Sequence, residues 1–171
     1  MINMEFEEII RKRTSVRKFS DKDLEKEKLN KILEAGRLAP TAKNNQPFKI
    51  CVVNSEEGLA KIDNASGCRY GAKTVLIVCG NKVEAYHKDD YSTYEMDSCI
   101  VATHMMLEAT NIGVDNIWIE SFDENILRDE FNIPIEYIPV CLLPLGYKAV
   151  DCPINPLHER RKNIEDIVEY R

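Results

Sequence analysis

The stretch Arg13-Thr14-Ser15-Val16-Arg17 carries side chains suited to an anionic ligand. In an extended chain Arg13, Ser15 and Arg17 point to the same side, because the side chains of a strand alternate between its two faces. Two guanidinium groups and a hydroxyl on one side match a phosphate or a polyol phosphate, since Arg presents a planar fork of donors to oxyanions. The same spacing also occurs in basic surface patches, so the stretch alone leaves both interpretations open.

A second segment, from Ala39 to Phe48, places side-chain amides between two prolines. Asn44 and Gln46 each offer a donor and an acceptor, as recognition of the edge of a heterocycle requires. Amides in loops are also common turn formers, so this loop is ambiguous when it is taken by itself.

A further group of cations, Arg160, Arg161 and Lys162, follows near the end of the chain. The whole sequence holds 23 Lys and Arg against 29 Asp and Glu, a net charge of −6. This balance argues against a nucleic-acid binder, which needs a basic surplus to replace the counterions of the phosphates. Two small basic clusters in an acidic protein fit one phosphate-bearing small ligand, and solvated surface charge is the alternative.

Other reactive side chains lack the spacing that their chemistry requires. A metal site from His104, Glu108 and Asp89-Asp90 matches no ligand spacing, so no metal is expected. We expect His104 to pack on a buried helix and Asp89-Asp90-Tyr91 to lie in a solvated loop. Ser15 lacks the G-x-S-x-G elbow of a hydrolase nucleophile, and no G-x-G-x-x-G follows a predicted strand. The six cysteines form no C-x-x-C pair and lie mostly in apolar runs, which places them in the core.

These residues must be positioned by elements that the apolar spacing predicts. The chain has the length of one domain, so a single domain is expected over residues 1–171. One helix is expected to start after Asp21 or Asp23 as N-cap and to end at Pro40. Helices and strands mix without strict alternation, which favours an α+β fold. The expected helices cover 5–13, 23–38, 56–63, 93–111 and 123–131, and the expected strands cover 49–53, 74–79, 114–119 and 137–146.

The predicted helix over 93–111 is apolar on nearly every side. Such a helix must be buried all round, and a domain of this size can hardly cover a helix of roughly five turns alone. A symmetric dimer is the simplest solution, and a central helix within one subunit is the alternative. The tail over about 153–171 holds Pro153 and Pro156 and then the strand-like Ile164–Val168, so it is expected to reach over the partner subunit.

The remaining composition indicates the cellular setting. No run of about 18 apolar residues indicates a membrane-spanning helix. The N-terminal residues lack the continuous apolar centre of a signal peptide, so a cytoplasmic location is expected.

Taken together, the motifs resemble those of the FMN-dependent nitroreductase family. The likeness rests on the order of R-x-S-x-R-x-F at Arg13–Phe19 and A-P-T-x-x-N-x-Q-P-F at Ala39–Phe48. It continues through Ile117–Asp123, Pro139–Tyr147 and Arg161–Val168. The resemblance implies a mostly antiparallel central sheet flanked by helices, with the C-terminal arm exchanged in a homodimer and FMN bound at the subunit interface.

The resemblance also implies roles for individual segments. Arg13–Arg17 would hold the phosphate and ribityl chain of FMN, and Arg160 and Arg161 would close on the phosphate. Pro40–Gln46 of the other subunit would line the isoalloxazine, and Ile119–Ser121 would lie near flavin N5 and O4. The implied cofactor-binding residues are Arg13, Thr14, Ser15, Arg17, Pro40, Thr41, Ala42, Asn44, Gln46, Ile119, Glu120, Ser121, Arg160 and Arg161.

The activity implied is that of an FMN-dependent NAD(P)H oxidoreductase. In the implied ping-pong reaction, flavin N5 takes a hydride from NADH or NADPH and the flavin then reduces a small organic oxidant such as a nitroaromatic or a quinone, with no catalytic amino acid. An FMN carrier or redox-responsive module with little turnover is one alternative, and specialised flavin chemistry on the same fold is another. Phe48 stands where Trp is commoner in the family, Ser121 stands where many members have Gly, and a helical excursion that shapes the substrate channel is missing, so the substrate stays open.

Overall fold

An antiparallel sheet with the strand order β1-β2-β6-β5 organises the protein, whose computed structural model describes residues 5–171. The strands are β1 (Phe48–Val53), β2 (Thr74–Asn81), β5 (Asp115–Asn116) and β6 (Tyr137–Gly146). β2 pairs with β1 and with β6, and the register between β2 and β6 shifts between Val78 and Cys79. This sheet and the helices around it confirm the predicted α+β class and the antiparallel pairing.

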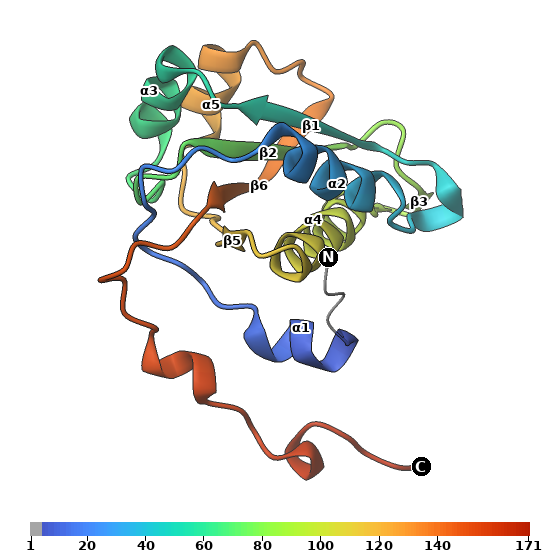
Figure 1. Cartoon of the computed structure of the whole chain (residues 1–171). Helices are drawn as coiled ribbons and strands as arrows, with labels where there is room; N and C mark the ends of the chain where they lie inside the picture. Colours follow the sequence, from blue (N-terminus) through green and yellow to red (C-terminus); the bar gives the residue numbers. More distant parts are fainter. Residues whose placement is uncertain (1–4) are drawn as a thin grey trace.

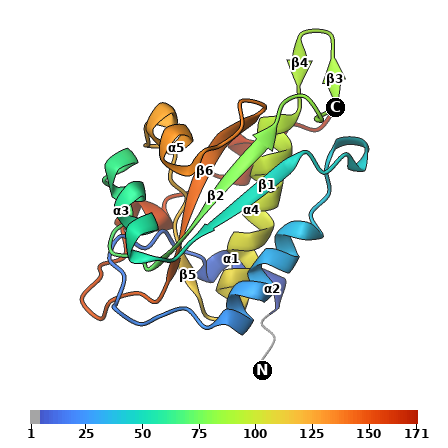
Figure 2. The same ribbon diagram turned by 90° about the horizontal axis from the view of Figure 1, so that it is seen from above.

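Helices cover both faces of the sheet (Figures 1 and 2). α3 (Glu56–Ala65) and α5 (Glu124–Phe131) lie on one face, and α2 (Lys26–Arg37) and α4 (Tyr94–Asn111) lie on the other. The short α1 (Phe6–Lys12) packs against the outer side of α4. The resulting layers explain why every residue of β2 is buried.

Alternation along β2 divides the core between the two faces. Val75 and Ile77 belong to the cluster that contacts α3 and α5, whereas Leu76 and Val78 belong to the cluster that contacts α2 and α4. This is the period of two that a strand imposes on its side chains, applied to a strand that is covered on both sides.

α4 has two different sides. Val101, Met105 and Ala109 are buried against the sheet and α2. The opposite side carries an open stripe, in which Met96 is 53% exposed and Thr103 and His104 are exposed. The expectation that His104 packs in a buried position is wrong for this chain, because the residue lies on that stripe with Nδ1 2.8 Å from the carbonyl oxygen of Ile100.

Two predicted element ends differ from the structure. α2 begins at Lys26 with Glu25 as N-cap, so neither Asp21 nor Asp23 caps it. The segment before the helix is held elsewhere, since the Asp23 carboxylate lies 3.2 Å from the Lys73 ammonium group. The strand expected over 114–119 shortens to β5 and one isolated bridge between Ile119 and Leu142, with the Ile117 amide between them donating to the Pro144 carbonyl oxygen of β6 at 3.3 Å.

Two segments fall outside the sheet. β3 (His87–Lys88) and β4 (Tyr91–Ser92) form a small hairpin whose turn contains the exposed Asp89 and Asp90, so the expected solvated loop is a hairpin tip. The tail holds two short 3₁₀ helices, η2 (Pro156–Glu159) and η3 (Ile164–Asp166). Residues 164–168, which were expected to reach a partner as a strand-like piece, begin with η3, are exposed along their length and pair with no strand of the described residues 5–171, so their pairing with a partner stays a prediction.

The helices are too short or too polar to cross a lipid bilayer within the described part of the chain. Within residues 5–171 none of the helices combines the length and the apolar content of a membrane-spanning segment.

Candidate functional site

The segment from Arg13 to Arg17 is held against the edge of the sheet. The Val16 amide donates to the Asn116 carbonyl oxygen at 3.1 Å, and Ser15 forms a parallel bridge with the same residue of β5. The Val16 side chain is only 1% exposed and so anchors the segment in the core. Because alternate side chains point to opposite sides, Arg13, Ser15 and Arg17 face away from that core, as the spacing predicted.

These side chains line a pocket of about 240 Å³ together with the start of the C-terminal tail. The tail contributes a short turn at η2, which the side chain of Asn155 caps by accepting from the Leu157 amide at 2.9 Å. The pocket is lined by Arg13, Thr14, Ser15, Arg17, Asn155, Leu157, His158 and Arg161. The lining contains three guanidinium groups, an imidazole and two hydroxyl groups, and none of these lining residues is a carboxylate.

The electrostatics of this pocket favour an anion. Burial, and then the nearby charge of Arg161, lower the pKa of Arg13 below its ordinary value. Like charges that are partly withdrawn from water repel each other, and a bound dianion would relieve both costs. The donor set therefore fits a phosphate group, which accepts several charge-assisted hydrogen bonds at once.

The two predicted arginines of the tail differ in their positions. Arg161 lines the pocket, with Nη1 donating to the carbonyl oxygens of His158 and, at 2.7 Å, of Arg160. The Arg160 side chain is exposed and is not among the residues that line the pocket.

The amide-rich loop lies at the other end of α4. The Ala42 amide donates to the carboxylate of Asp97 in the first turn of α4, whereas the edge that holds Ser15 is joined to the last turn through Asn116 and Thr110. A rise of about 1.5 Å per residue puts roughly 20 Å of helix between these turns. Within one chain the structure therefore does not bring the loop and the anion pocket together.

The third predicted segment, Ile119–Ser121, lies beside the sheet. Ile119 is buried and bridges to Leu142, while the Glu120 and Ser121 side chains are exposed. The Glu120 carboxylate accepts from Trp118 Nε1 at 2.8 Å, and the Ser121 carbonyl oxygen accepts from Ser66 Oγ at 2.7 Å. These bonds fix the backbone of the segment and leave its outer face open.

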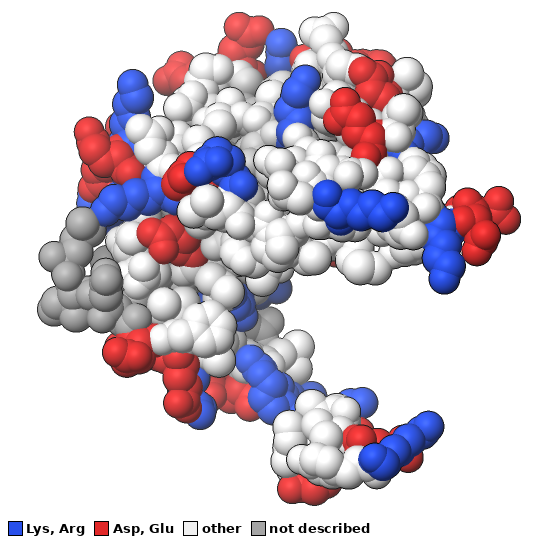
Figure 3. Space-filling view, turned by 90° about the vertical axis from the view of Figure 1, so that its right-hand side faces the viewer, with Lys and Arg blue, Asp and Glu red and all other residues white. Residues whose placement is uncertain are grey.

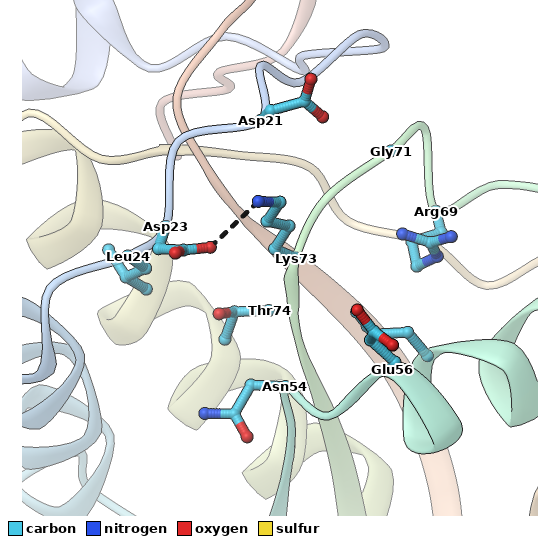
Figure 4. Close-up of a pocket in the computed structure, with 10 residues that line it drawn as sticks. Asp21, Asp23, Leu24, Asn54, Glu56, Arg69, Gly71, Lys73 and Thr74 are labelled. Atoms are coloured by element: carbon cyan, nitrogen blue, oxygen red, sulfur yellow. Dashed lines mark ion pairs between the residues drawn. The ribbon is translucent and has the colours of Figure 1, made fainter.

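A larger pocket of about 660 Å³ lies on another part of the surface, beside the start of β2 (Figure 4). Its cations are already paired, because Lys73 lies 3.2 Å from Asp23 and Arg69 lies 2.6 Å from Asp63. None of the predicted site residues contributes to its lining, which consists of Asp21, Asp23, Leu24, Asn54, Glu56, Leu59, Arg69, Gly71, Lys73 and Thr74. Size alone therefore does not identify the functional site.

The tail extends the anion pocket into an open surface. The space-filling view shows the arm standing away from the body with a hollow between them (Figure 3). Ile164 is 61% exposed and Ile167 is 63% exposed on this arm. These side chains make the arm a partly apolar surface that no other part of the described chain covers.

Sequence reasoning missed three residues of the anion pocket, and it also missed Asp97, which accepts a hydrogen bond from the amide-rich loop. Asn155, Leu157 and His158 enter the pocket because η2 folds back over Arg13–Arg17, and only their closeness to the basic cluster could have indicated them. Asp97 lies in the first turn of a largely apolar helix beside a second acidic residue, the exposed Glu95, so the sequence did not single it out.

Comparison with known proteins is consistent with this geometry. The model of the Nitroreductase family matches residues 10–70 and 69–147. A nitroreductase family protein of Clostridium difficile 630 superposes with a TM-score of 0.91 at 36% identity, covering 98% of each chain. A candidate NADH dehydrogenase/NAD(P)H nitroreductase of Methanothermobacter thermautotrophicus is 28% identical over 156 residues, which are 85% of this chain and 78% of that protein.

A further solved structure shares the fold and was determined with a ligand. It is a candidate nitroreductase of Exiguobacterium sibiricum in complex with FMN, with a TM-score of 0.86 at 24% identity over 100% of this chain and 99% of the other. The family model covers far more than half of the sequence and agrees with the expected motifs. The chain described here belongs to the Nitroreductase family.

Proposed function

We propose that this protein is an NAD(P)H-dependent oxidoreductase that uses FMN as its bound cofactor. The observation that carries the proposal is the pocket in which Arg13, Arg17 and Arg161 converge without a carboxylate in the lining. Family membership and the names of relatives, which include NAD(P)H nitroreductases, support it. When bound, FMN would supply hydride acceptance from NADH or NADPH and reduction of a small organic oxidant such as a nitroaromatic or a quinone.

The residues of this chain would bind and orient the cofactor. Arg13, Arg17 and Arg161 would neutralise its phosphate, and the hydroxyls of Thr14 and Ser15 would donate to phosphate or ribityl oxygens. The open backbone at Glu120 and Ser121 is the proposed neighbour of the reacting edge of the ring. Arg160 could reach the phosphate only if the tail shifts, since its side chain lies outside the pocket.

The proposed site is shared between two copies of the chain. The Pro40–Gln46 loop lies about one α4 length from the anion pocket of its own chain, so it can complete only the site of a partner. A symmetric dimer built on the open stripe of α4 would exchange these loops reciprocally and would also cover the arm. The observations that support this arrangement are the exposed Met96 side chain on the stripe and the exposed apolar side chains of the arm.

Removing single cations tests the proposed phosphate site. Arg13→Ala and Arg161→Ala should each raise the dissociation constant of FMN, because loss of one charge-assisted contact costs about 1.5–3 kcal/mol. The matched control is Lys162→Ala, which removes a neighbouring cation that does not line the pocket. Fluorescence titration of the apoprotein with FMN measures all three, and unchanged affinity in both arginine variants would refute this phosphate site.

Electron transfer is tested separately from binding. Anaerobic mixing of the FMN-loaded protein with NADH, and in parallel with NADPH, should bleach the visible flavin absorption with at least one donor. A flavin that stays oxidised with both donors, while FMN remains bound, would replace the oxidoreductase proposal with that of a flavin carrier.

A further inference from the structure

The Pro40–Gln46 loop, which would complete the proposed flavin site of a partner subunit, has a strained backbone. Lys43, Asn44 and Gln46 have φ angles of 53°, 56° and 52°, in the left-handed region that residues with a side chain avoid. Three such residues within four positions persist only where the surroundings fix them. Strain of this kind is typical of segments that hold a ligand in a set geometry.

A buried carboxylate fixes the start of this loop. Asp97 Oδ1 accepts from the Ala42 amide at 2.8 Å, and Asp97 Oδ2 accepts from Thr93 Oγ1 at 2.7 Å. The Asp97 residue is only 2% exposed. Its two oxygens therefore join the loop to the first turn of α4 through directed bonds that water does not screen.

No ordinary structural need explains a carboxylate at this position. No ion pair within residues 5–171 involves Asp97, and burial of a carboxylate without a cation is costly. The start of α4 offsets part of this cost, because the N-terminal end of a helix favours negative charge. The bond to Ala42 leaves the helix altogether, so it serves the loop and does not cap α4.

Further contacts close the loop, and one of them engages a predicted recognition amide, because Gln46 Nε2 donates to the Asn44 carbonyl oxygen at 3.3 Å. Thr41 Oγ1 accepts from the Gln46 amide at 2.9 Å, and Asn45 Nδ2 donates to the Glu84 carbonyl oxygen at 3.0 Å. The Lys43 ammonium group lies 4.4 Å from the centre of the Tyr86 ring. The Asn44 side chain, in contrast, is exposed and makes no hydrogen bond within the described part of the chain.

We propose that Asp97 is a positioning residue that holds the Thr41–Gln46 loop in its strained conformation, so that the Asn44 amide is presented to the flavin ring of the partner's site. This inference rests on the proposed FMN function. Asp97 itself would make no contact with the cofactor. Its effect passes through the Ala42 amide, whose bond sets the direction in which the loop leaves α4.

Substitutions at Asp97 separate positioning from general stability. Asp97→Ala leaves the half-buried Ala42 amide without its acceptor and releases the start of the loop, so FMN affinity should fall by about tenfold. Asp97→Asn can still accept from Ala42, and its amide can donate to a reoriented Thr93 hydroxyl, so FMN affinity should stay within about threefold of the wild type. Thr93→Val removes only the bond to Asp97 Oδ2 and should give an intermediate loss, because the Thr93 side chain makes no cap bond to the helix.

A core substitution elsewhere serves as the matched control. Ile62→Val lowers stability within the α3 side of the core, far from the loop, and should leave the FMN dissociation constant unchanged. Thermal unfolding of all four variants shows how much stability each one loses. Sedimentation of the same samples shows whether the oligomeric state is retained.

A readout on the apoprotein makes the test independent of turnover. Amide hydrogen exchange at Ala42 should become faster in Asp97→Ala and Thr93→Val and should stay close to wild type in Asp97→Asn. The bound flavin should show a shifted visible spectrum in the first two variants only. Wild-type FMN affinity, spectrum and Ala42 exchange in both Asp97→Ala and Thr93→Val would overturn the role of Asp97, whereas a wild-type protein that takes up no FMN would overturn the proposed function itself.

Discussion

At the scale of single residues, some cations of the protein are paired with carboxylates, whereas others lie beside another cation. Arg69 and Lys73 beside the larger pocket are paired with carboxylates, whereas Arg13 faces Arg161. The lowered pKa of Arg13 is the signature of that second situation. The proposed anion site therefore rests on this excess of positive charge and not on pocket volume.

A different group of residues fixes α2 to the end of β6. Glu25 accepts from the Tyr147 hydroxyl and lies 3.0 Å from the Lys22 ammonium group, while Lys28 Nζ donates to the same hydroxyl at 2.9 Å. The bond from Tyr147, followed by backbone and Lys22 contacts, lowers the pKa of Glu25 from 4.5 to about 2.

The lowered pKa of Glu25 predicts that the protein loses folding stability at acid pH. A carboxyl whose pKa is lowered by folding contributes its full stability above its unfolded pKa and loses it as the pH falls through its folded pKa. The urea midpoint of the wild type should therefore fall between about pH 4.5 and pH 2 more steeply than that of Glu25→Gln. Glu27→Gln on the same helix is the control and should follow the wild type. Parallel curves for the wild type and Glu25→Gln would contradict the prediction.

At the scale of elements, the position of α4 depends on a glycine in the neighbouring strand. A Cβ atom at Gly80 would lie 2.7 Å from the Tyr94 carbonyl oxygen and 2.8 Å from Ser98 Oγ. The α4 backbone could make room for this added Cβ atom only by a shift that would also move the turn that holds Asp97. Gly80 thus permits the close approach of β2 to the start of α4.

A comparison of two glycine substitutions tests this packing. Gly80→Ala should destabilise the fold by about 1–3 kcal/mol, because the added methyl group meets helix backbone. A Cβ at Gly36 would lie 2.9 Å from Cγ and Sδ of Met105, a flexible side chain, and Ala gains about 1 kcal/mol over Gly within a helix. Gly36→Ala should therefore lower the free energy of unfolding, measured in urea, by less than Gly80→Ala does. Equal decreases in this free energy would show that the two contacts are equally rigid.

At the scale of the whole molecule, the open stripe of α4 and the arm are the surfaces that a second copy would cover. Thr103→Arg places a large cation in the middle of this stripe and should shift the protein to monomers, since burial of an unpaired charge opposes association. FMN affinity should fall with it, because the proposed site needs the partner's loop. Asp129→Arg on the exposed side of α5 is the control and should leave the sedimentation coefficient unchanged.

Sedimentation of the wild type and of Thr103→Arg can each contradict part of this model. A wild-type protein that sediments as a monomer while it holds FMN would exclude the shared site. A Thr103→Arg variant that stays dimeric would move the interface away from the α4 stripe.

The sequence by itself determined most of the elements and the basic segment Arg13–Arg17 on one side of the anion pocket. β2 was predictable because burial on both sides imposes an apolar run, and α4 was predictable from its length and high apolar content although one of its sides is open. Arg13, Ser15 and Arg17 were predictable as a group because a strand fixes the direction of alternate side chains. Glu25 as N-cap and the short β5 were not, since the ends of elements depend on contacts with distant residues such as Lys73 and Leu142.

Only the tertiary structure decided how the site is assembled. The fold of η2 over Arg13 brought His158 and Arg161 into one pocket and left Arg160 outside it. The length of α4 separated the amide loop from that pocket, and the bond from Ala42 to Asp97 selected one residue of an apolar helix as the support of the loop. These outcomes depend on distances between residues far apart in the chain, which local spacing in a sequence does not contain.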